Sequence, residues 1–342
     1  MIPRNCFASI GGAQESFNLR GKFVALYGKP VGRQSIVNGK PFRAQVGSEV
    51  QFALEAKSPC PCGSGKRLWR CCLTAKGLRK PAARTAPHLP QTMIPNERCY
   101  AAPLADCVSE ISREHYVSKS LLRYINRVGG GMTVSGPRWL KDGPRKLPPD
   151  ALAANVLCRR HNAALSHLDD IAVRLFKAFD DANAGGSGRQ EIYLFNGHDV
   201  ERWMLKILCG IAASHSIGTP ATDLSFPPSW LNLLFGRGDL LFEQGLYVCK
   251  GIGQLSEGPR GLKFAIITTD RRLSGLQLFI CGYELVLTMV GFPTRMLDGR
   301  QFAYRPMELF KSARNYESSV VFTWDFLADG GTISSEVEER PA

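Results

Sequence analysis

The chain has 342 residues, enough for two or three domains, and carries 43 Lys and Arg against 30 Asp and Glu, a formal charge of +13. Its longest apolar stretch, 276–293, is interrupted by Gly282 and Glu284, and the first twenty residues contain no apolar core. We therefore expect neither a membrane span nor a signal peptide. The eleven cysteines, an odd number, are clustered like metal ligands, which predicts a reducing, cytoplasmic location.

The first segment, 1–56, alternates apolar and polar residues around Gly-Lys turns between 23 and 56, which predicts a small β-rich unit. Four cysteines then follow within thirteen residues, in the order C-x-C-x8-C-C: Cys60, Cys62, Cys71 and Cys72. Soft thiolates in a closed set of four favour Zn²⁺, and the Gly63-Ser64-Gly65 turn lets the backbone fold around one ion. Disulfides are the alternative, although one loop would close over a single residue.

A zinc ion with four thiolates has a formal charge of −2, and we expect Lys66, Arg67 and Arg70 to offset it. Gly-Ser-Gly-Lys is not a phosphate loop, because the earlier Gly is missing and no Ser or Thr follows Lys66. Within the segment 57–76, a stretch of about fifteen residues resembles the SEC-C metal-binding motif. The resemblance implies a non-catalytic zinc knuckle that contacts protein or ribosomal partners.

Positive charge is concentrated around this motif and in the Pro-rich linker 77–95 behind it. Residues 57–100 contain nine Lys or Arg and one acid, Glu97, a difference of +8. Such a patch favours phosphate binding through the side chains of Lys66, Arg67, Arg70, Lys76, Arg79 and Lys80. A solubilising, partly disordered linker is the alternative. Trp69 is placed either to stack on a base or to pack over the zinc.

The next segment, 96–184, contains a second set of metal-ligand types. Cys99 and Cys107 are followed by a C-x2-H pair, Cys158 and His161, which is a common zinc spacing although a lone pair of this kind arises by chance. Between and after them lie Glu114-His115, Asn155 and Asn162. In this order the residues resemble the HNH nuclease family, whose ββα-metal fold holds one divalent cation between a β-hairpin and a helix.

The resemblance implies a role for each residue. His115 is the general base; Glu114 and Asn162 bind a catalytic Mg²⁺ or Mn²⁺; Asn155 holds the loop that carries His115. Cys99, Cys107, Cys158 and His161 hold a structural zinc, with His161 in place of the family's last cysteine. The separation between His115 and Asn155 is longer than usual, and 128–150, rich in Gly, Pro and basic residues, predicts an inserted loop. His167 is expected on a solvated helix face.

Residues 185–330 predict an α+β domain without a cluster of catalytic residue types. Apolar residues recur at helical spacing from Ile171 to Phe179 and again from about Asp199. From about residue 245, stretches rich in β-branched and aromatic residues predict antiparallel strands packed on these helices. The last segment, 331–342, has the composition of a disordered acidic tail. Cys6, Cys209, Cys249 and Cys281 are left over and are expected to be ordinary thiols.

The sequence therefore predicts an α+β protein with a SEC-C zinc knuckle, an HNH-like ββα core with a structural zinc, a helical segment and a C-terminal β-rich domain. The favoured function is a metal-dependent endonuclease acting on DNA, with the knuckle as an accessory surface. The alternative is a non-catalytic zinc adaptor that recruits a protein or nucleic-acid partner. The two differ in whether Glu114, His115 and Asn162 converge on one open metal position.

Overall fold

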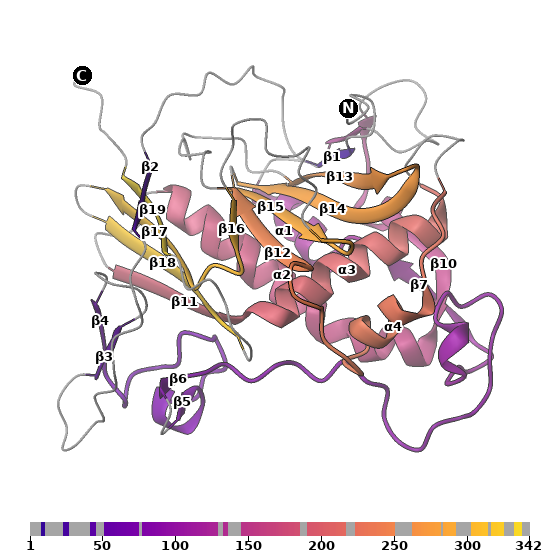
Figure 1. The fold of residues 1–342 in the computed structure, drawn as a ribbon, viewed down its shortest axis with the longest axis horizontal. Coiled ribbons are helices and arrows are strands. Elements are labelled where there is room, and N and C mark those ends of the chain that lie inside the picture. The colour runs from indigo at the N-terminus through magenta and orange to yellow at the C-terminus, as the bar shows by residue number, and fades with distance from the viewer. Residues whose placement is uncertain are drawn as a thin grey trace.

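A computed structural model describes residues 8–10, 23–26, 42–45, 51–74, 77–128, 133–135, 145–184, 190–216, 223–249, 262–281, 283–291, 302–313, 316–324 and 332–336. Cys6, Lys76 and much of the insertion 128–150 lie outside these residues. The fold is α+β, as predicted, and its parts are arranged around helices in the middle of the chain (Figure 1). The helices are α1 (Lys119–Val128), α2 (Arg159–Ala184), α3 (Gly197–Ser214) and α4 (Pro228–Leu234).

Helix α2 continues well beyond the HNH-like motif, so the motif's helix and the predicted apolar helix around Ile171 are one element. Helix α3 begins after Asn196, whose side chain accepts a hydrogen bond from the backbone N–H of Asp199, a standard N-cap. Its apolar stripe is buried, as expected, and packs against α2. These two helices form the centre of the main core.

An eight-stranded sheet packs on α3 and is antiparallel throughout, as predicted for this part of the chain. Its order is β16-β12-β15-β14-β13-β1-β8-β9. The strands are β1 (Ala8–Ile10), β8 (Thr133–Ser135), β9 (Arg145–Lys146), β12 (Gly245–Cys249), β13 (Leu262–Thr269), β14 (Arg272–Ile280), β15 (Tyr283–Thr288) and β16 (Phe302–Tyr304). Part of the insertion therefore extends this sheet through β8 and β9.

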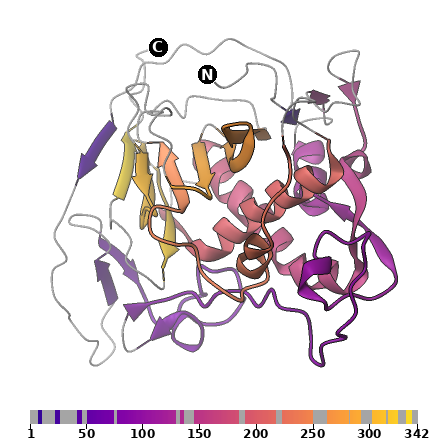
Figure 2. The same ribbon diagram turned by 45° about the vertical axis from the view of Figure 1, so that its right-hand side comes forward.

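A second sheet of five strands packs on α2 and has the order β11-β18-β17-β19-β2. Figure 2 shows its yellow C-terminal strands to one side of the helices. Its strands are β2 (Phe23–Leu26), β11 (Gln190–Asn196), β17 (Glu308–Ala313), β18 (Tyr316–Thr323) and β19 (Thr332–Glu336). It is mixed, because β11 runs parallel to β18 and β17 parallel to β19. The expectation that all strands of this region are antiparallel was therefore wrong.

The prediction of a disordered tail was also wrong for Thr332–Glu336, which form β19 between β17 and β2. The tail's polar composition gave no warning, because the backbone hydrogen bonds of a strand do not depend on side-chain polarity. Residues 337–342 lie outside the described part.

Three two-stranded antiparallel sheets complete the fold: β3 (Phe42–Gln45) with β4 (Gln51–Leu54), β5 (Leu73–Thr74) with β6 (Gly77–Leu78), and β7 (Ile111–His115) with β10 (Ala153–Cys158). The last pair is a hairpin with a long connection that contains α1, β8 and β9. Short 3₁₀ helices lie at Leu68–Arg70, Ala102–Leu104 and Pro149–Leu152. In the part of the chain that the structure describes, no helix is both long and apolar enough to cross a membrane.

The linker between the two cysteine clusters is bound to the body of the protein by its backbone. The N–H of Lys80 donates to Thr323 Oγ1, its carbonyl accepts from Asn196 Nδ2, and the N–H of Ala83 donates to the Asp199 carboxylate at 2.9 Å. These partners stand near the start of α3 and the end of β18. We call residues 77–95 the strap, because its described contacts hold it against the body.

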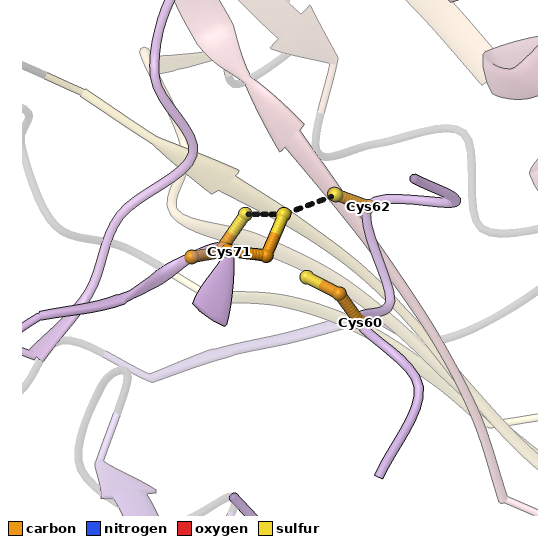
Figure 3. Close-up of side chains that lie close together, drawn as sticks. Cys60, Cys62 and Cys71 are labelled. Atoms are coloured by element: carbon orange, nitrogen blue, oxygen red, sulfur yellow. Dashed lines mark hydrogen bonds between the residues drawn. The ribbon is translucent and has the colours of Figure 1, made fainter. Parts of the chain in front are cut away.

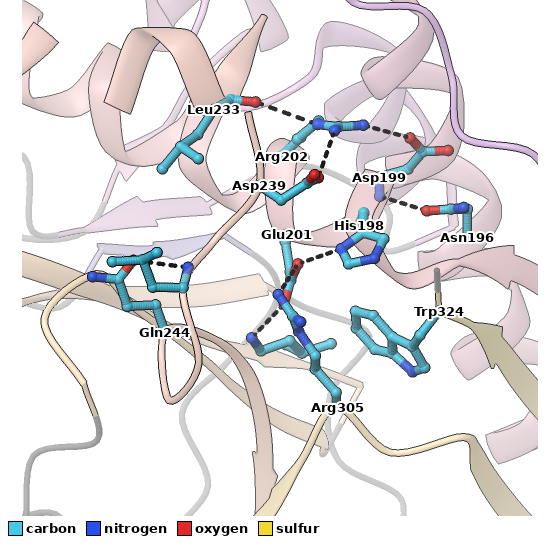
Figure 4. A network of polar contacts seen from close by, with 12 residues as sticks. Asn196, His198, Asp199, Glu201, Arg202, Leu233, Asp239, Gln244, Arg305 and Trp324 are labelled. Carbon is cyan, nitrogen blue, oxygen red and sulfur yellow. Dashed lines mark hydrogen bonds and ion pairs between the residues drawn. The ribbon is translucent and has the colours of Figure 1, made fainter. Parts of the chain in front are cut away.

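A buried polar network at the start of α3 joins this helix to both sheets (Figure 4). Glu201 accepts hydrogen bonds from Arg305 Nε at 2.8 Å and from the backbone N–H of Leu246 at 2.9 Å, and its other oxygen lies 3.0 Å from His198 Nδ1. Trp324 packs edge-to-face on His198. Because each charge has a partner, the network stabilises one relative position of helix and sheets.

Candidate metal centres and active site

The first four cysteines are brought together by a tight loop and one turn of 3₁₀ helix. The N–H of Cys60 donates to the Lys66 carbonyl at 2.8 Å, and the N–H of Cys72 donates to the Leu68 carbonyl at 3.1 Å. Gly63 and Gly65 have φ values of +73° and +72°, which a residue with a Cβ adopts only with strain. The local sequence thus folds back so that all four sulfurs face one point.

The sulfurs of Cys60, Cys62, Cys71 and Cys72 could hold one metal ion. Figure 3 shows Cys60, Cys62 and Cys71 lying close together. All four lie within 4.8 Å of one another. The Sγ atoms of Cys62 and Cys71 are 3.4 Å apart, and those of Cys71 and Cys72 are 3.7 Å apart. Zinc with bonds of about 2.3 Å separates its sulfur ligands by about 3.8 Å. None of these cysteines is in a disulfide, so this cluster could hold zinc as predicted.

The loop that carries these four cysteines, which we call the knuckle, is docked on the five-stranded sheet. Its sulfurs form an apolar cluster with Leu54, Leu68, Leu194 and Val321, and the N–H of Leu194 donates to the Pro61 carbonyl at 3.1 Å. The opposite side is exposed and basic, with Lys66, Arg67 and Arg70 in solvent. Trp69 is 48% exposed, and the Arg70 guanidinium lies 4.4 Å from the centroid of its ring.

The second cluster is fully buried between the β7–β10 hairpin and the first turn of α2. The Nδ1 atom of His161 lies 3.7 Å from the sulfurs of Cys99 and Cys107 and 3.2 Å from that of Cys158. A tetrahedral zinc places such nitrogen and sulfur ligands about 3.6 Å apart. These four residues could therefore hold zinc through Nδ1 of His161.

Burial sets the protonation of this second cluster. It raises the pKa of the Cys99 and Cys107 thiols, and it lowers the pKa of His161 to about 4, so the imidazole is neutral at pH 7. A neutral imidazole is ready to bind a metal, whereas the thiols release protons when the metal enters. Metal binding at this cluster is thus coupled to pH.

The hairpin and helix have the order expected for a ββα unit. Strand β7 pairs antiparallel with β10, with His115 opposite Ala153 and Glu114 opposite Ala154, and α2 follows β10 directly. The register shifts between Ala154 and Leu157, a bulge that contains Asn155. Asn155 is exposed on this bulge. Helix α1, which was not predicted from the sequence, lies between β7 and the insertion.

His115 ends β7 and is largely buried, with 14% of its side chain exposed. Its Nε2 lies 2.9 Å from Asp150 Oδ1, and Asp150 also pairs with Lys119 at 2.5 Å. Because a carboxylate only accepts hydrogen bonds, Nε2 carries the proton and Nδ1 of the neutral ring is the basic atom. Burial lowers the pKa of His115, and the hydrogen bond to Asp150 opposes this shift. His115 therefore has the protonation state of a general base at neutral pH.

Glu114 points the other way, into the core, where Lys206 of α3 pairs with it at 2.9 Å. The same ammonium lies 2.6 Å from Asp169 Oδ1 on α2. Asp169 also accepts a hydrogen bond from Ser118 at 2.6 Å. Burial raises the pKa of Glu114, and the nearby charge of Lys206 only partly opposes this shift. For Lys206, burial acts to lower the pKa, but the carboxylates of Glu114 and Asp169 outweigh it, so its pKa is raised. A protein cation therefore stands beside the carboxylate predicted to bind a divalent metal.

Asn162 lies on the first turn of α2, and its Nδ2 donates to Ser112 Oγ at 2.9 Å. Among the described residues, the groups of at least three Cys, His, Asp or Glu placed to hold a metal are the two cysteine clusters, and neither includes Glu114. As these side chains lie, Glu114 does not fit a divalent cation, since Lys206 neutralises it. The hydrogen bond of Asn162 comes from its amide nitrogen and leaves open what its amide oxygen binds.

The side chains predicted to contact nucleic acid are exposed to solvent at Lys66, Arg67, Arg70 and Arg79. Arg79 is exposed like the knuckle cations, and Lys80 is half-buried, with its Nζ donating to the Pro81 carbonyl at 3.0 Å. His167 is exposed on α2, as expected, and Cys209, Cys249 and Cys281 are buried thiols.

Sequence reasoning missed Asp150, Asp169 and Lys206. Asp150 precedes β10 by three residues, and only the hairpin register places it beside His115. Lys206 was detectable in principle, because it interrupts the apolar stripe of α3 between Trp203 and Ile207. A lysine at such a position is buried and needs an acidic partner.

Comparisons of the chain with protein-family models, with curated proteins and with solved structures found no match.

Proposed function

We propose that this protein is an endonuclease that hydrolyses phosphodiester bonds in DNA, with His115 as its general base. The observation that supports this is the His115–Asp150 pair at the end of β7, on a hairpin that the Cys99–His161 cluster joins to α2. A histidine held in one tautomer, with a lowered pKa and a basic Nδ1, has what is needed to activate water.

In the proposed reaction, Nδ1 of His115 takes a proton from water as the water oxygen bonds to phosphorus. The opposite P–O bond breaks, and the leaving oxygen is protonated from solvent. Two cations place positive charge next to His115, where a phosphate would approach. Lys119 pairs with the Asp150 carboxylate, and Arg113 donates to the Asp150 backbone carbonyl at 2.8 Å. No step is assigned to a divalent cation, because Lys206 pairs with Glu114. DNA as substrate rests on the HNH resemblance and on the basic knuckle surface.

The test is cleavage of supercoiled plasmid and of single-stranded DNA, in the presence of Mg²⁺, Mn²⁺ or a chelator of free divalent cations, at matched zinc content. His115→Ala is expected to lower the rate by about 10²- to 10⁴-fold. His167→Ala, which removes an exposed histidine from the same unit, is the control and should cleave like the unmodified protein. Equal cleavage by the two variants would refute the role of His115.

A second function, a zinc-stabilised adaptor without catalysis, is favoured by the Lys206–Glu114 pair and by the exposed knuckle face. An adaptor needs the two cysteine clusters and a binding surface, and has no need for an open metal position. No cleavage of either substrate under any of these metal conditions would favour the adaptor over the nuclease.

A further inference from the structure

Helix α2 reaches from one cysteine cluster to the other. Its first turn provides His161 to the second cluster, and Arg174, thirteen residues later, lies under the knuckle loop. Arg174 Nη2 donates to the carbonyls of Pro61 and Leu194, at 3.4 Å each. The guanidinium is so close to Gly63 that a Cβ placed there would lie 2.8 Å from Arg174 Nε.

The environment of Arg174 differs from that of the other cations near the knuckle. Its side chain is half-buried, and its guanidinium lies 4.9 Å above the ring of Phe195. Burial lowers the pKa of Arg174, whereas the thiolates of Cys62, Cys60 and Cys72 raise it. An arginine remains protonated despite such a shift, so a fixed positive charge faces the cluster.

Charge compensation at the knuckle therefore differs from the sequence-based expectation. Zinc with four thiolates has a net charge of −2. Lys66, Arg67 and Arg70 are exposed, where water and salt screen their attraction to the sulfurs. The contact of Arg174 with the knuckle is partly buried, where the effective dielectric constant is lower, so the same positive charge stabilises the thiolates more.

We propose that Arg174 is the outer-sphere cation of the knuckle, and that it strengthens zinc binding by Cys60, Cys62, Cys71 and Cys72 while it docks the knuckle on α2. The ligand concerned is a thiophilic divalent cation. Arg174 positions the knuckle through its hydrogen bond to the Pro61 carbonyl, and it offsets the negative charge of the zinc–thiolate cluster. This inference does not depend on nuclease activity.

The experiment is zinc transfer from the full-length protein to a chromogenic chelator, with Co²⁺ substitution to follow thiolate charge-transfer absorption. The phase that is lost in Cys71→Ser identifies the knuckle. Arg174→Gln, which removes the charge and keeps a hydrogen-bond donor, is expected to weaken zinc binding in that phase by about 10- to 100-fold. Arg174→Lys should restore most of the affinity, because it restores the charge.

Arg67→Gln is the matched control, since it removes one exposed charge from the knuckle itself, and it should leave the knuckle phase nearly unchanged. The phase from the Cys99–His161 cluster reports whether α2 remains folded. Unchanged affinity in Arg174→Gln would overturn the proposal. So would equal losses in Arg174→Gln and Arg174→Lys, or a loss in both zinc phases together.

Discussion

At the scale of single residues, Asp150 decides which nitrogen of His115 is basic. Its carboxylate accepts a hydrogen bond from the Nε2–H group and raises the pKa of His115, which burial lowers. With this pKa below its usual value, the neutral ring persists to pH values below about 6.5. The position of the Asp150 carboxylate therefore helps to set the pH range in which the proposed general base is active.

Asp150→Asn removes the carboxylate that raises the pKa of His115, so the acid limb of the pH–rate profile is expected to move to lower pH. The rate on the plateau should also fall, because an amide can donate as well as accept and no longer selects one tautomer. The fall should be smaller than the roughly 10²- to 10⁴-fold loss expected without the base. Cleavage rates between pH 5 and 8 measure both effects; an acid limb that moves upward would contradict the assignment.

Lys206 is the counter-charge of two carboxylates, Glu114 and Asp169, and lies almost wholly in the core. Lys206→Met is expected to lower the free energy of unfolding by about 3 to 5 kcal/mol, because it leaves the buried Glu114 and the partly exposed Asp169 without their partner. Urea unfolding followed by circular dichroism measures the loss.

Lys177→Met removes an exposed lysine from α2 and is the control for Lys206→Met. A similar small effect of both variants would mean that Lys206 is not the needed counter-ion. Added Mn²⁺ should stabilise Lys206→Met more than the unmodified protein if the released carboxylates accept a divalent cation.

At the scale of elements, the contact between α3 and the end of β7 depends on one glycine. A Cβ on Gly210 would lie 2.6 Å from the Cβ of Tyr116, the residue after His115, and 3.2 Å from its Cα. Gly210 thus allows α3 to approach the backbone that positions His115.

Gly210→Ala is expected to destabilise the protein by about 1 to 3 kcal/mol, although alanine favours helices, because the added methyl group overpacks this contact. Gly238→Ala is the control, since its Cβ would meet only Leu233 Cδ2 at an ordinary 3.7 Å. Thermal unfolding of both variants tests the prediction. A more stable Gly210→Ala would show that the helix moves away without cost.

The sequence predicted correctly those elements whose structure is determined by residues close together in the chain. The spacing of Cys60 to Cys72 and of Cys158 to His161 indicated both clusters, and apolar periodicity indicated α2 and α3. It did not indicate Asp150 beside His115 or Lys206 beside Glu114, because those contacts depend on hairpin register and helix packing. Nor did it indicate that β11 pairs in parallel with β18, which joins segments more than a hundred residues apart.

At the scale of the whole molecule, the excess of positive charge predicts how DNA binding depends on salt. Affinity for duplex DNA should fall linearly on a log–log plot against salt concentration. Replacing Lys66, Arg67 and Arg70 by Gln should make the slope shallower by about one for each phosphate that these side chains no longer neutralise. Fluorescence anisotropy at several salt concentrations measures the slope.

The control for this slope replaces Lys177, Arg271 and Arg272, three exposed cations outside the knuckle, by Gln and so removes the same charge. If both triple variants change the slope equally, DNA responds to total charge and not to the knuckle face.

In the proposed nuclease, the strap determines how the knuckle and His115 act together on DNA. Because Asn196, Asp199 and Thr323 bind its backbone, the knuckle and His115 are held at a set spacing and angle. A flexible tether would let the knuckle hold DNA while the active site searched nearby phosphates, and its length would tune their effective concentration. In the proposed nuclease, a fixed spacing would instead select the cleavage position, so that a strand bound at the knuckle is expected to present one particular phosphate to His115.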